Sequence, residues 1–444
     1  AGGYARGAPA RNSLLTAMLS RTLYRLIDIR EHEIRAFLWS FLYFFLLLCA
    51  YYILRPVRDE MGILGGIKNL PWLFTGTFIA MLMVVPLFGW VSARYPRRRF
   101  LPYVYGFFII NLLIFYLLFR LHTEEQIVAR AFFIWISVFN LFVVSVFWSY
   151  MNDLYDQAQA KRLFGVIATG GTAGAITGPA ITTMLVESLG VVHMLLISAA
   201  LLGLAMLCIS RLSAWYDDHA TQQQRDIVHQ PMGGSWLAGV RLVVQSPYLL
   251  GIGLLIILYS TLSTFLYLQQ ASIIQDSFSG SAERTSVFAM IDLAVNVLTV
   301  LLQLFVTSRL VKYLGLPLSL AIIPALLVVG FIALATAPVL AVLIVVQVLR
   351  RAGNYAIMRP AREMLYSVLG REEKYKAKNF IDTVVYRGGD AASSWVYDGF
   401  RAMGLGIGQI AMIAAPLAGV WAYVSWQLGR RREQMEINQE ETRS

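Results

Sequence analysis

Residues 37–60 read FLWSFLYFFLLLCAYYILRPVRDE, an apolar run that ends in Arg55-Pro56-Val57-Arg58-Asp59-Glu60. The part from Phe37 to Leu54 is mostly aliphatic and aromatic, and a helix of about 20 such residues is long enough to cross a bilayer. Charged residues at the end of such a helix are costly in hydrocarbon unless they face water or a partner. This stretch therefore predicts a membrane-spanning helix with a charged, functional end.

Similar runs recur along the whole chain. The first six spans are predicted at Phe37–Leu54, Trp72–Ser92, Leu101–Phe119, Ala131–Met151, Phe164–Val186 and Val191–Ile209. The second six are predicted at Tyr248–Gln269, Ser286–Thr307, Leu316–Thr336, Pro338–Met358, Phe380–Phe400 and Leu405–Gln427. The fold class that follows is an all-α membrane protein with about 12 transmembrane helices.

The composition agrees with a chain built for lipid. Charged residues make up 14% and hydrophobic residues 58% of the sequence, and the mean hydropathy is +0.62, whereas a soluble domain carries about a quarter of charged residues. The net charge of +11 does not indicate a nucleic-acid partner, because almost no folded soluble surface is left to present it. With both termini placed in the cytoplasm, the inner segments hold 29 Lys and Arg and the outer loops 7. This predicts an integral protein of the bacterial inner membrane with both termini cytoplasmic.

Five parts are predicted along the chain. They are a cytoplasmic N-terminal segment over 1–35 with an interfacial helix near Leu14–Leu26, a six-helix bundle over 36–210, a cytoplasmic linker over 211–246, a second six-helix bundle over 247–428 and a cytoplasmic tail over 429–444. Two six-helix bundles joined by a cytoplasmic linker are typical of major-facilitator-like carriers, in which the substrate site lies near the midplane between the halves.

The charged motif after the first span has an internal echo near the tenth. Arg359-Pro360-Ala361-Arg362-Glu363 repeats the pattern of Arg55–Glu60. In carriers with inverted repeats the first and tenth spans both line the central cavity, and the planar guanidinium fork suits phosphate and carboxylate groups. The echo predicts a pathway for an anion. The alternative is that each arginine is paired with an acid of its own motif.

Other charged and polar residues lie deeper in the predicted spans. Arg350, Arg351 and Asn354 fall about midway through the tenth span, and such deep burial favours a role in a cavity. Arg387 and Asp390 are three residues apart in the eleventh span. They are either an internal ion pair or part of the pathway.

The sequence carries no signature of catalysis or of a metal site. It has no P-loop and no glycine-flanked nucleophilic serine, and its five His lack zinc spacing. Cys49 and Cys208 both lie within apolar runs, so neither a disulfide framework nor a zinc site is indicated. We therefore predict that the protein is not an enzyme and uses no cofactor or metal.

Several motifs together resemble the ATP/ADP antiporter family of plastids and intracellular bacteria. They are Arg55–Glu60, with Arg58 in place of the family's Lys, Phe147-Trp148 with Asn152, Ala160-Lys161-Arg162, Pro360–Met364 with Tyr366, Lys376-Ala377-Lys378, Ile381-Asp382 and Gly388-Gly389. The resemblance runs from the first span to the eleventh, and it implies that Arg58, Arg351 and Arg362 contact nucleotide phosphates. The family's exchangers also carry acidic residues in the fourth and seventh spans, which 132–147 and 255–268 lack.

The sequence thus favours alternating-access transport of a phosphorylated anion, first of all ATP/ADP-type nucleotide exchange. Predicted substrate-binding residues are Arg55, Arg58, Asn152, Arg351, Asn354, Arg359, Arg362 and Arg387. Predicted coupling or gating residues are Asp59, Asp292, Glu363 and Asp390, and Asp292 in the eighth span is either a coupling-ion ligand or the partner of a cavity arginine. Two alternatives stay open: a transporter or flippase of an anionic lipid or another phosphorylated metabolite, and a non-transporting receptor or assembly factor that recruits partners through 211–245 or the basic C-terminus.

Overall fold

The computed structural model describes residues 29–94, 97–121, 124–219 and 236–443, and in these ranges the chain is helical without a strand. The first helices are α2 (Ile34–Leu64), α3 (Leu70–Arg94), α4 (Arg97–Arg120), α5 (Glu125–Leu154), α6 (Gln157–Leu189), α7 (His193–His219) and the short α9 (Trp236–Gln245). The later helices are α10 (Pro247–Ser277), α11 (Ser281–Leu302), α12 (Ser308–Thr336), α13 (Leu340–Gly353), α14 (Arg359–Leu365), α15 (Arg371–Phe380), α16 (Tyr386–Ala402) and α17 (Ile407–Arg443). The interfacial helix predicted near Leu14–Leu26 lies outside the described residues.

Within the described residues, 11 helical segments are long and apolar enough to cross a membrane. They coincide with the predicted spans except for Phe380–Phe400, which is also helical but interrupts its apolar residues with Asp382, Arg387 and Asp390. The prediction of an all-α membrane protein with about 12 spanning helices is therefore confirmed. The polar residues of the remaining segment face the cavity described below.

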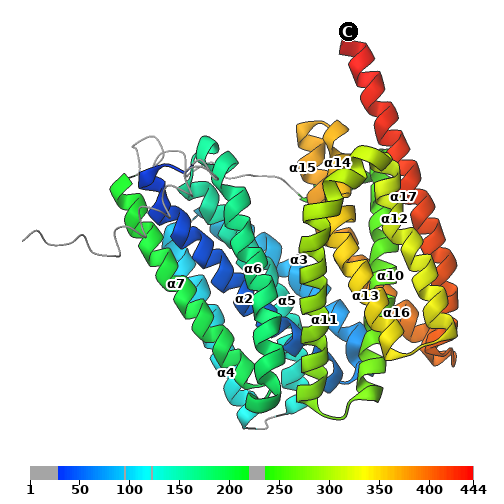
Figure 1. The fold of residues 1–444 in the computed structure, drawn as a ribbon, viewed down its shortest axis with the longest axis horizontal. Helices are drawn as coiled ribbons and strands as arrows, with labels where there is room; N and C mark the ends of the chain where they lie inside the picture. Colours follow the sequence, from blue (N-terminus) through cyan, green and yellow to red (C-terminus); the bar gives the residue numbers. More distant parts are fainter. Residues whose placement is uncertain (1–28, 95–96, 122–123, 220–235, 444) are drawn as a thin grey trace, which may run out of the picture.

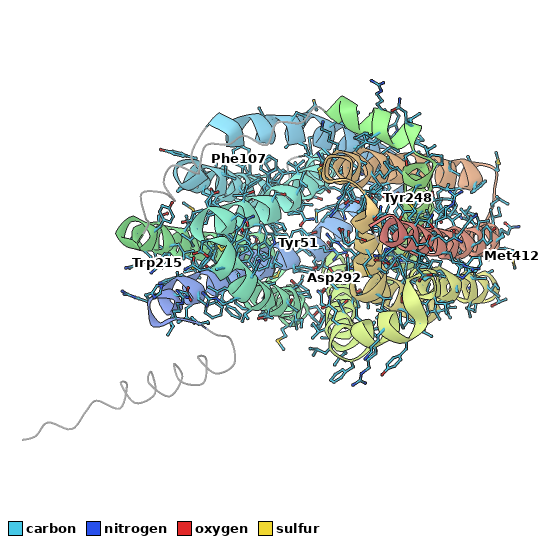
Figure 2. The ribbon with its side chains drawn as sticks, turned by 90° about the horizontal axis from the view of Figure 1, so that it is seen from above. Tyr51, Phe107, Trp215, Tyr248, Asp292 and Met412 are labelled. Carbon is cyan, nitrogen blue, oxygen red and sulfur yellow. The ribbon has the colours of Figure 1, made fainter. Side chains whose placement is uncertain are left out.

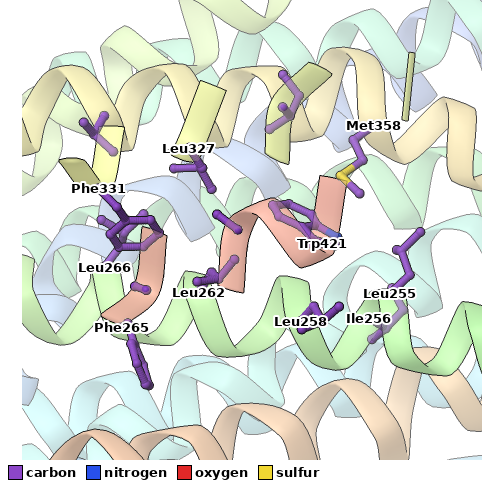
Figure 3. Close-up of a cluster of buried hydrophobic side chains, with 14 of the residues drawn as sticks. Leu255, Ile256, Leu258, Leu262, Phe265, Leu266, Leu327, Phe331, Met358 and Trp421 are labelled. Atoms are coloured by element: carbon purple, nitrogen blue, oxygen red, sulfur yellow. The ribbon is translucent and has the colours of Figure 1, made fainter. Parts of the chain in front are cut away.

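The helices form two bundles that lie side by side, α2–α7 and α10–α17 (Figure 1). In the part of the chain that the structure describes, the buried side chains form two clusters. One lies in the first bundle around Tyr43 and Phe147, and the other lies mainly in the second bundle around Leu262, Phe331 and Trp421 (Figure 3) and extends to Phe74 and Phe133 of the first. The start of α2 and the end of α17 lie at the same end of the molecule, which we call the terminal end; the end of α2 and the start of α11 mark the opposite, far end (Figure 1).

Helices α2 and α6 approach so closely that their contact requires glycine. A Cβ on Gly174 would lie 2.3 Å from the Phe45 carbonyl oxygen, and one on Gly178 would lie 2.7 Å from the Cys49 carbonyl oxygen. Small residues let membrane helices pack backbone against backbone, and that close packing stabilises them in lipid. The contact fixes α2, which carries the first arginine motif, against the rest of its bundle.

At the terminal end, Glu33 joins the start of α2 to α6. Its carboxylate accepts hydrogen bonds from the Arg162 guanidinium at 2.9 Å, the Gln159 side-chain amide at 3.0 Å and the Arg30 backbone N–H at 2.9 Å. Burial alone raises the pKa of Glu33, but the Arg162 guanidinium and the other donors outweigh it and lower that pKa below its ordinary value. The carboxylate therefore stays ionised and bonded at neutral pH.

Gly174→Ala should destabilise the protein by about 1–3 kcal/mol, because the added methyl group must push the α2 and α6 backbones apart. The matched control is Gly165→Ala on the same helix, where a Cβ meets nothing within 4 Å and the better helix former should be neutral or slightly stabilising. Thermal unfolding of the detergent-solubilised variants measures both. Equal melting temperatures for the two variants would contradict the close contact.

Candidate functional site

A cavity of about 910 Å³ lies between the two bundles, a size that suits a small-molecule ligand. Helices α2, α5 and α6 of the first bundle line it together with α10, α11, α13, α14 and α16 of the second. Seen from above, Tyr51 and Asp292 lie in the middle of the molecule, between the bundles (Figure 2). Among the described residues, seven arginines line the cavity: Arg55, Arg58, Arg350, Arg351, Arg359, Arg362 and Arg387.

A wide helical turn places four of these arginines. Helices α13 and α14 are joined without a break by the π-helical turn Asn354–Met358. A π turn is wider than an α turn and changes which side chains share a helix face, and such turns are frequent at functional sites. The two arginines before the turn and the two after it all line the cavity. A second π turn, Ile381–Val385, directly precedes Arg387.

The carboxylate of Asp292 lies between two arginines and is 1% exposed. Its Oδ1 accepts a hydrogen bond from Arg351 at 2.5 Å, and its Oδ2 lies 3.6 Å from Nε of Arg55. The arginines line the cavity, while Asp292 lies behind them. Of the two sequence interpretations of Asp292, the one observed is that of partner to cavity arginines.

Arg58 is held by one acid and two aromatic rings. Its guanidinium lies 3.1 Å from the Asp59 carboxylate and 4.0 Å from the centre of the Phe133 ring, and it faces Tyr267 at 5.8 Å. The Tyr267 hydroxyl donates to the same Asp59 oxygen at 3.0 Å. The predicted local pairing with Asp59 is therefore present, yet the side chain remains 18% exposed and lines the cavity.

Arg350 has no carboxylate partner among the described residues. Its guanidinium donates to the Ser263 hydroxyl at 2.6 Å and to the Gln347 side-chain oxygen at 2.9 and 3.2 Å. Gln347 in turn donates to Gln270 at 2.5 Å. Neutral groups thus orient this cation without cancelling its charge. One turn further on, Asn354 donates to the Tyr259 hydroxyl at 3.1 Å.

The second arginine motif, Arg359–Glu363, does not pair with the acid of its own motif, although one alternative from the sequence predicted that it would. Arg362 lies 3.2 Å from Asp382, whereas Glu363 accepts a hydrogen bond from Lys378 at 2.5 Å. The alternative that Arg362 pairs with Glu363 is therefore wrong. Asp382 lies in the π turn before Arg387, opposite α14, and it is the residue that pairs with Arg362. Arg359 is exposed and lines the cavity.

Arg387 and Asp390 form an ion pair at 3.3 Å, and both line the cavity. Asp390 also accepts hydrogen bonds from Ser260 at 2.7 Å and Thr264 at 3.3 Å. The ion pair predicted as one alternative is therefore present, and both of its members line the cavity. The contact ties α16 to α10 within the second bundle.

The structure brings most of the predicted site residues together, but not all. Asn152 is exposed near the end of α5, and neither it nor Glu363 lines the cavity. Sequence reasoning also missed the pair of Glu60 and Arg284, whose atoms lie as close as 2.6 Å. Glu60 and Arg284 are both charged and lie close to predicted spans, but no sequence spacing indicates that two residues so far apart in the chain form a pair.

The cavity holds more cations than anions. Against its seven arginines stand Asp59, Asp382 and Asp390 in the lining and Asp292 behind it, so three positive charges are in excess when every group is ionised. A water-restricted cleft with charges of one sign in excess concentrates ligands of the other sign. Within the described residues no group of three or more His, Cys, Asp or Glu could hold a metal ion.

Several contacts between the two bundles lie at the far end. Arg284 makes two hydrogen bonds to the fully buried Glu60, at 2.6 and 2.8 Å, and also donates to the carbonyls of Phe278 and Ser279. Nearby, Trp395 packs edge-on against Trp72 and donates to a neighbouring threonine of α3. The cavity lining, in contrast, extends through α14 toward the terminal end.

Comparisons with known proteins agree on a carrier fold. Residues 36–374 match the family model described as Major Facilitator Superfamily. "ADP,ATP carrier protein 1" of Chlamydia muridarum (strain MoPn / Nigg) is 24% identical over 84% of this chain and 83% of its own, and "ADP,ATP carrier protein 2" of Chlamydia pneumoniae is 20% identical over 93% and 91%.

Solved structures show the same fold at low sequence identity. The nucleoside transporter NupG has a TM-score of 0.58 at 14% identity and covers 91% of this chain and 99% of its own. A bacterial homologue of the iron transporter ferroportin in an inward-facing state has a TM-score of 0.63 at 14% identity, with 90% and 98% covered.

Asp292→Asn should lower the free energy of unfolding by about 3–5 kcal/mol, because the buried Arg351 and the half-buried Arg55 would lose their shared counter-charge. Asp276→Asn, at the exposed end of α10, is the control and should change stability by no more than about 0.5 kcal/mol. Thermal unfolding in detergent compares the two. An Asp292→Asn protein as stable as the control would show that the arginines do not depend on this carboxylate.

Proposed function

The chain belongs to the Major Facilitator Superfamily, and we propose that this membrane transporter carries a phosphorylated anion, most specifically a nucleotide, by exchange across the membrane. The observation that carries the proposal is the cluster of seven arginines in a single cavity. One of them, Arg350, is held only by neutral groups among the residues that the structure describes. A cluster of this kind is unfavourable without an anion, and a bound anion removes the repulsion.

Arginine chemistry favours phosphate as the group that is bound. The guanidinium fork makes two parallel hydrogen bonds to phosphate oxygens, and hydrogen bonds between charged groups are stronger than neutral ones. A phosphate chain has enough oxygens to engage several arginines at once, whereas a single carboxylate does not. Arg350, Arg359 and the partly exposed Arg58 and Arg362 are the contacts we propose.

The nucleotide itself is supported by the relatives. Both Chlamydia proteins are named ADP,ATP carriers, and the alignment covers most of each chain. The sequence motifs that resemble the same family include Arg58, Arg351 and Arg362, which all line the cavity. At 20–24% identity the fold is shared, and the substrate is what the experiment below tests.

The mechanism that we propose is alternating access. The buried Glu60–Arg284 pair and its neighbours close the far end, so that substrate enters from the terminal end in this conformation. Rocking of the bundles would then break these contacts and open the far end. A ligand shifts such an equilibrium only if it binds the two states differently. An anion that relieves arginine repulsion in the closed intermediate would do so. It would thereby couple the entry of one substrate to the exit of another.

We also propose the orientation. With the terminal end in the cytoplasm, the segments that hold most of the Lys and Arg lie on the cytoplasmic side, as the positive-inside rule requires. In a bacterium, this membrane is the inner one. The cavity would then open to the cytoplasm.

Arg58→Gln and Arg350→Gln should each weaken ADP binding by about tenfold or more, since a hydrogen bond to a charged group contributes about 1.5–3 kcal/mol. Ligand-dependent stabilisation of the purified protein measures binding, because a ligand that prefers the folded state raises its melting temperature. Arg401→Gln is the matched control: this exposed arginine donates to the Leu405 carbonyl outside the cavity, and its loss should leave ADP binding unchanged.

Other outcomes of that titration separate the alternatives. Stabilisation by an anionic lipid or another phosphorylated metabolite, with no response to nucleotides, would contradict nucleotide exchange and favour the other substrate. Absence of stabilisation by every phosphorylated compound, together with a copurifying protein, would favour a receptor or assembly factor.

Glu60→Gln should favour opening of the far end, because it removes the carboxylate that Arg284 binds across the two bundles. Spin labels on Lys68→Cys and Asp276→Cys, both exposed near the far end, report the separation by electron–electron distance measurement. The native Cys49 and Cys208 are buried and should not react. Glu363→Gln, which breaks a pair within one bundle, is the control; a distance distribution that changes equally in both variants would contradict a sealing role.

A further inference from the structure

The two walls of the cavity differ in charge. All seven arginines come from α2 and from helices of the second bundle. The wall made by α5 contributes only neutral side chains: Ile136, Ser137, Asn140, Leu141, Val144 and Ser145. A ligand that carried charge on every side would leave this wall unused, so the cavity suits a molecule with one anionic end and one uncharged end.

The helical register of α5 places the neutral wall relative to the phosphate end. Phe133, Ser137, Asn140 and Val144 follow one another at spacings of three or four residues, which puts them along one helix face. The Arg58 guanidinium lies over Phe133 at one end of this row. Asn140 is seven residues further along, and at 1.5 Å per residue this is about 10 Å. This rise along the helix axis leaves room for the sugar of a nucleotide between a phosphate bound at Arg58 and a base bound at Asn140.

The side-chain amide of Asn140 stands out on this wall. It lines the cavity, is half-buried, and makes no hydrogen bond to any residue that the structure describes. Two nearby hydroxyls are bonded within their own helices: Ser137 donates to the Phe133 carbonyl at 3.1 Å and Thr172 to the Ala168 carbonyl at 3.3 Å. Ser145, the other polar side chain of this wall, makes no hydrogen bond within the described residues, but it offers a single hydroxyl rather than a paired donor and acceptor. A polar group in a partly apolar wall needs a hydrogen-bond partner, and here only water or a ligand in the cavity can supply it.

We propose that Asn140 is a specificity-determining residue that binds the adenine base of the substrate. This inference rests on the proposed function, which supplies the phosphate end. A carboxamide presents one acceptor and one donor side by side, and this pair matches the amino group and ring nitrogen that adenine offers at one edge. Guanine offers two acceptors at the same edge, so the amide can satisfy only one of them. Asn140 would therefore favour adenine over guanine nucleotides.

The test compares ADP, GDP and pyrophosphate on the purified full chain, by isothermal titration and by thermal stabilisation. In the wild type we expect ADP to bind about tenfold more tightly than GDP. Asn140→Ala should reduce ADP binding by about tenfold, remove the preference over GDP and leave pyrophosphate binding unchanged. Asn140→Leu, of similar size, should behave alike, and the melting temperature of each variant without ligand checks that it is folded.

The control is Asn111→Ala on α4, where the exposed amide donates to the Phe107 carbonyl away from the cavity. It should leave all three affinities unchanged. The inference is overturned if Asn140→Ala leaves the ADP affinity intact, or if it weakens ADP and pyrophosphate equally, which would indicate a general effect on the cavity. Failure of the wild type to bind either ADP or pyrophosphate would instead refute the proposed function, and the inference with it.

Discussion

The buried carboxylate of Asp292 lies between Arg55 and Arg351, and the centre of the molecule depends on this contact. It joins α2 of the first bundle to α11 and α13 of the second at a point where both arginines also face the cavity. Without a counter-charge, two guanidinium groups so close together in a region of low dielectric would repel each other and stay desolvated. Asp292 therefore allows a cationic cavity to exist in the absence of substrate, and it does so from behind, leaving the cavity face of both arginines free.

The amino-acid sequence predicts the fold well because each span is a local property of its own residues. Apolar runs and the distribution of Lys and Arg are both recognised without knowledge of the partner helix. The pairings are not local. Asp382 rather than Glu363 meets Arg362, and Arg284 meets Glu60, because helix packing and the π turns decide which faces oppose each other. Arg350 stood out by its depth, but no motif indicates that Ser263 and Gln347 hold it, in place of any carboxylate from the described part of the chain.

The cavity thus combines three degrees of charge compensation. Asp292 compensates two arginines permanently, Asp59 and Asp382 compensate partly exposed ones, and Arg350 is held by neutral groups. An incoming phosphate chain can bind Arg58, Arg362 and Arg350 without breaking the contacts that Asp292 makes with its two arginines. Opposite them, the uncharged α5 wall leaves room for the rest of the molecule. This division explains how a single cavity could bind a highly charged substrate and still release it.

Anion exchange can be measured directly by counterflow in proteoliposomes. Vesicles containing the purified protein are loaded with unlabelled ADP, with buffer alone, or with an uncharged nucleoside, and uptake of radiolabelled ATP is followed. Anion exchange predicts rapid uptake only into vesicles loaded with ADP, because the arginine cavity changes the side to which it opens only when an anion occupies it. Equal uptake into empty and loaded vesicles, or none in any of them, would contradict it.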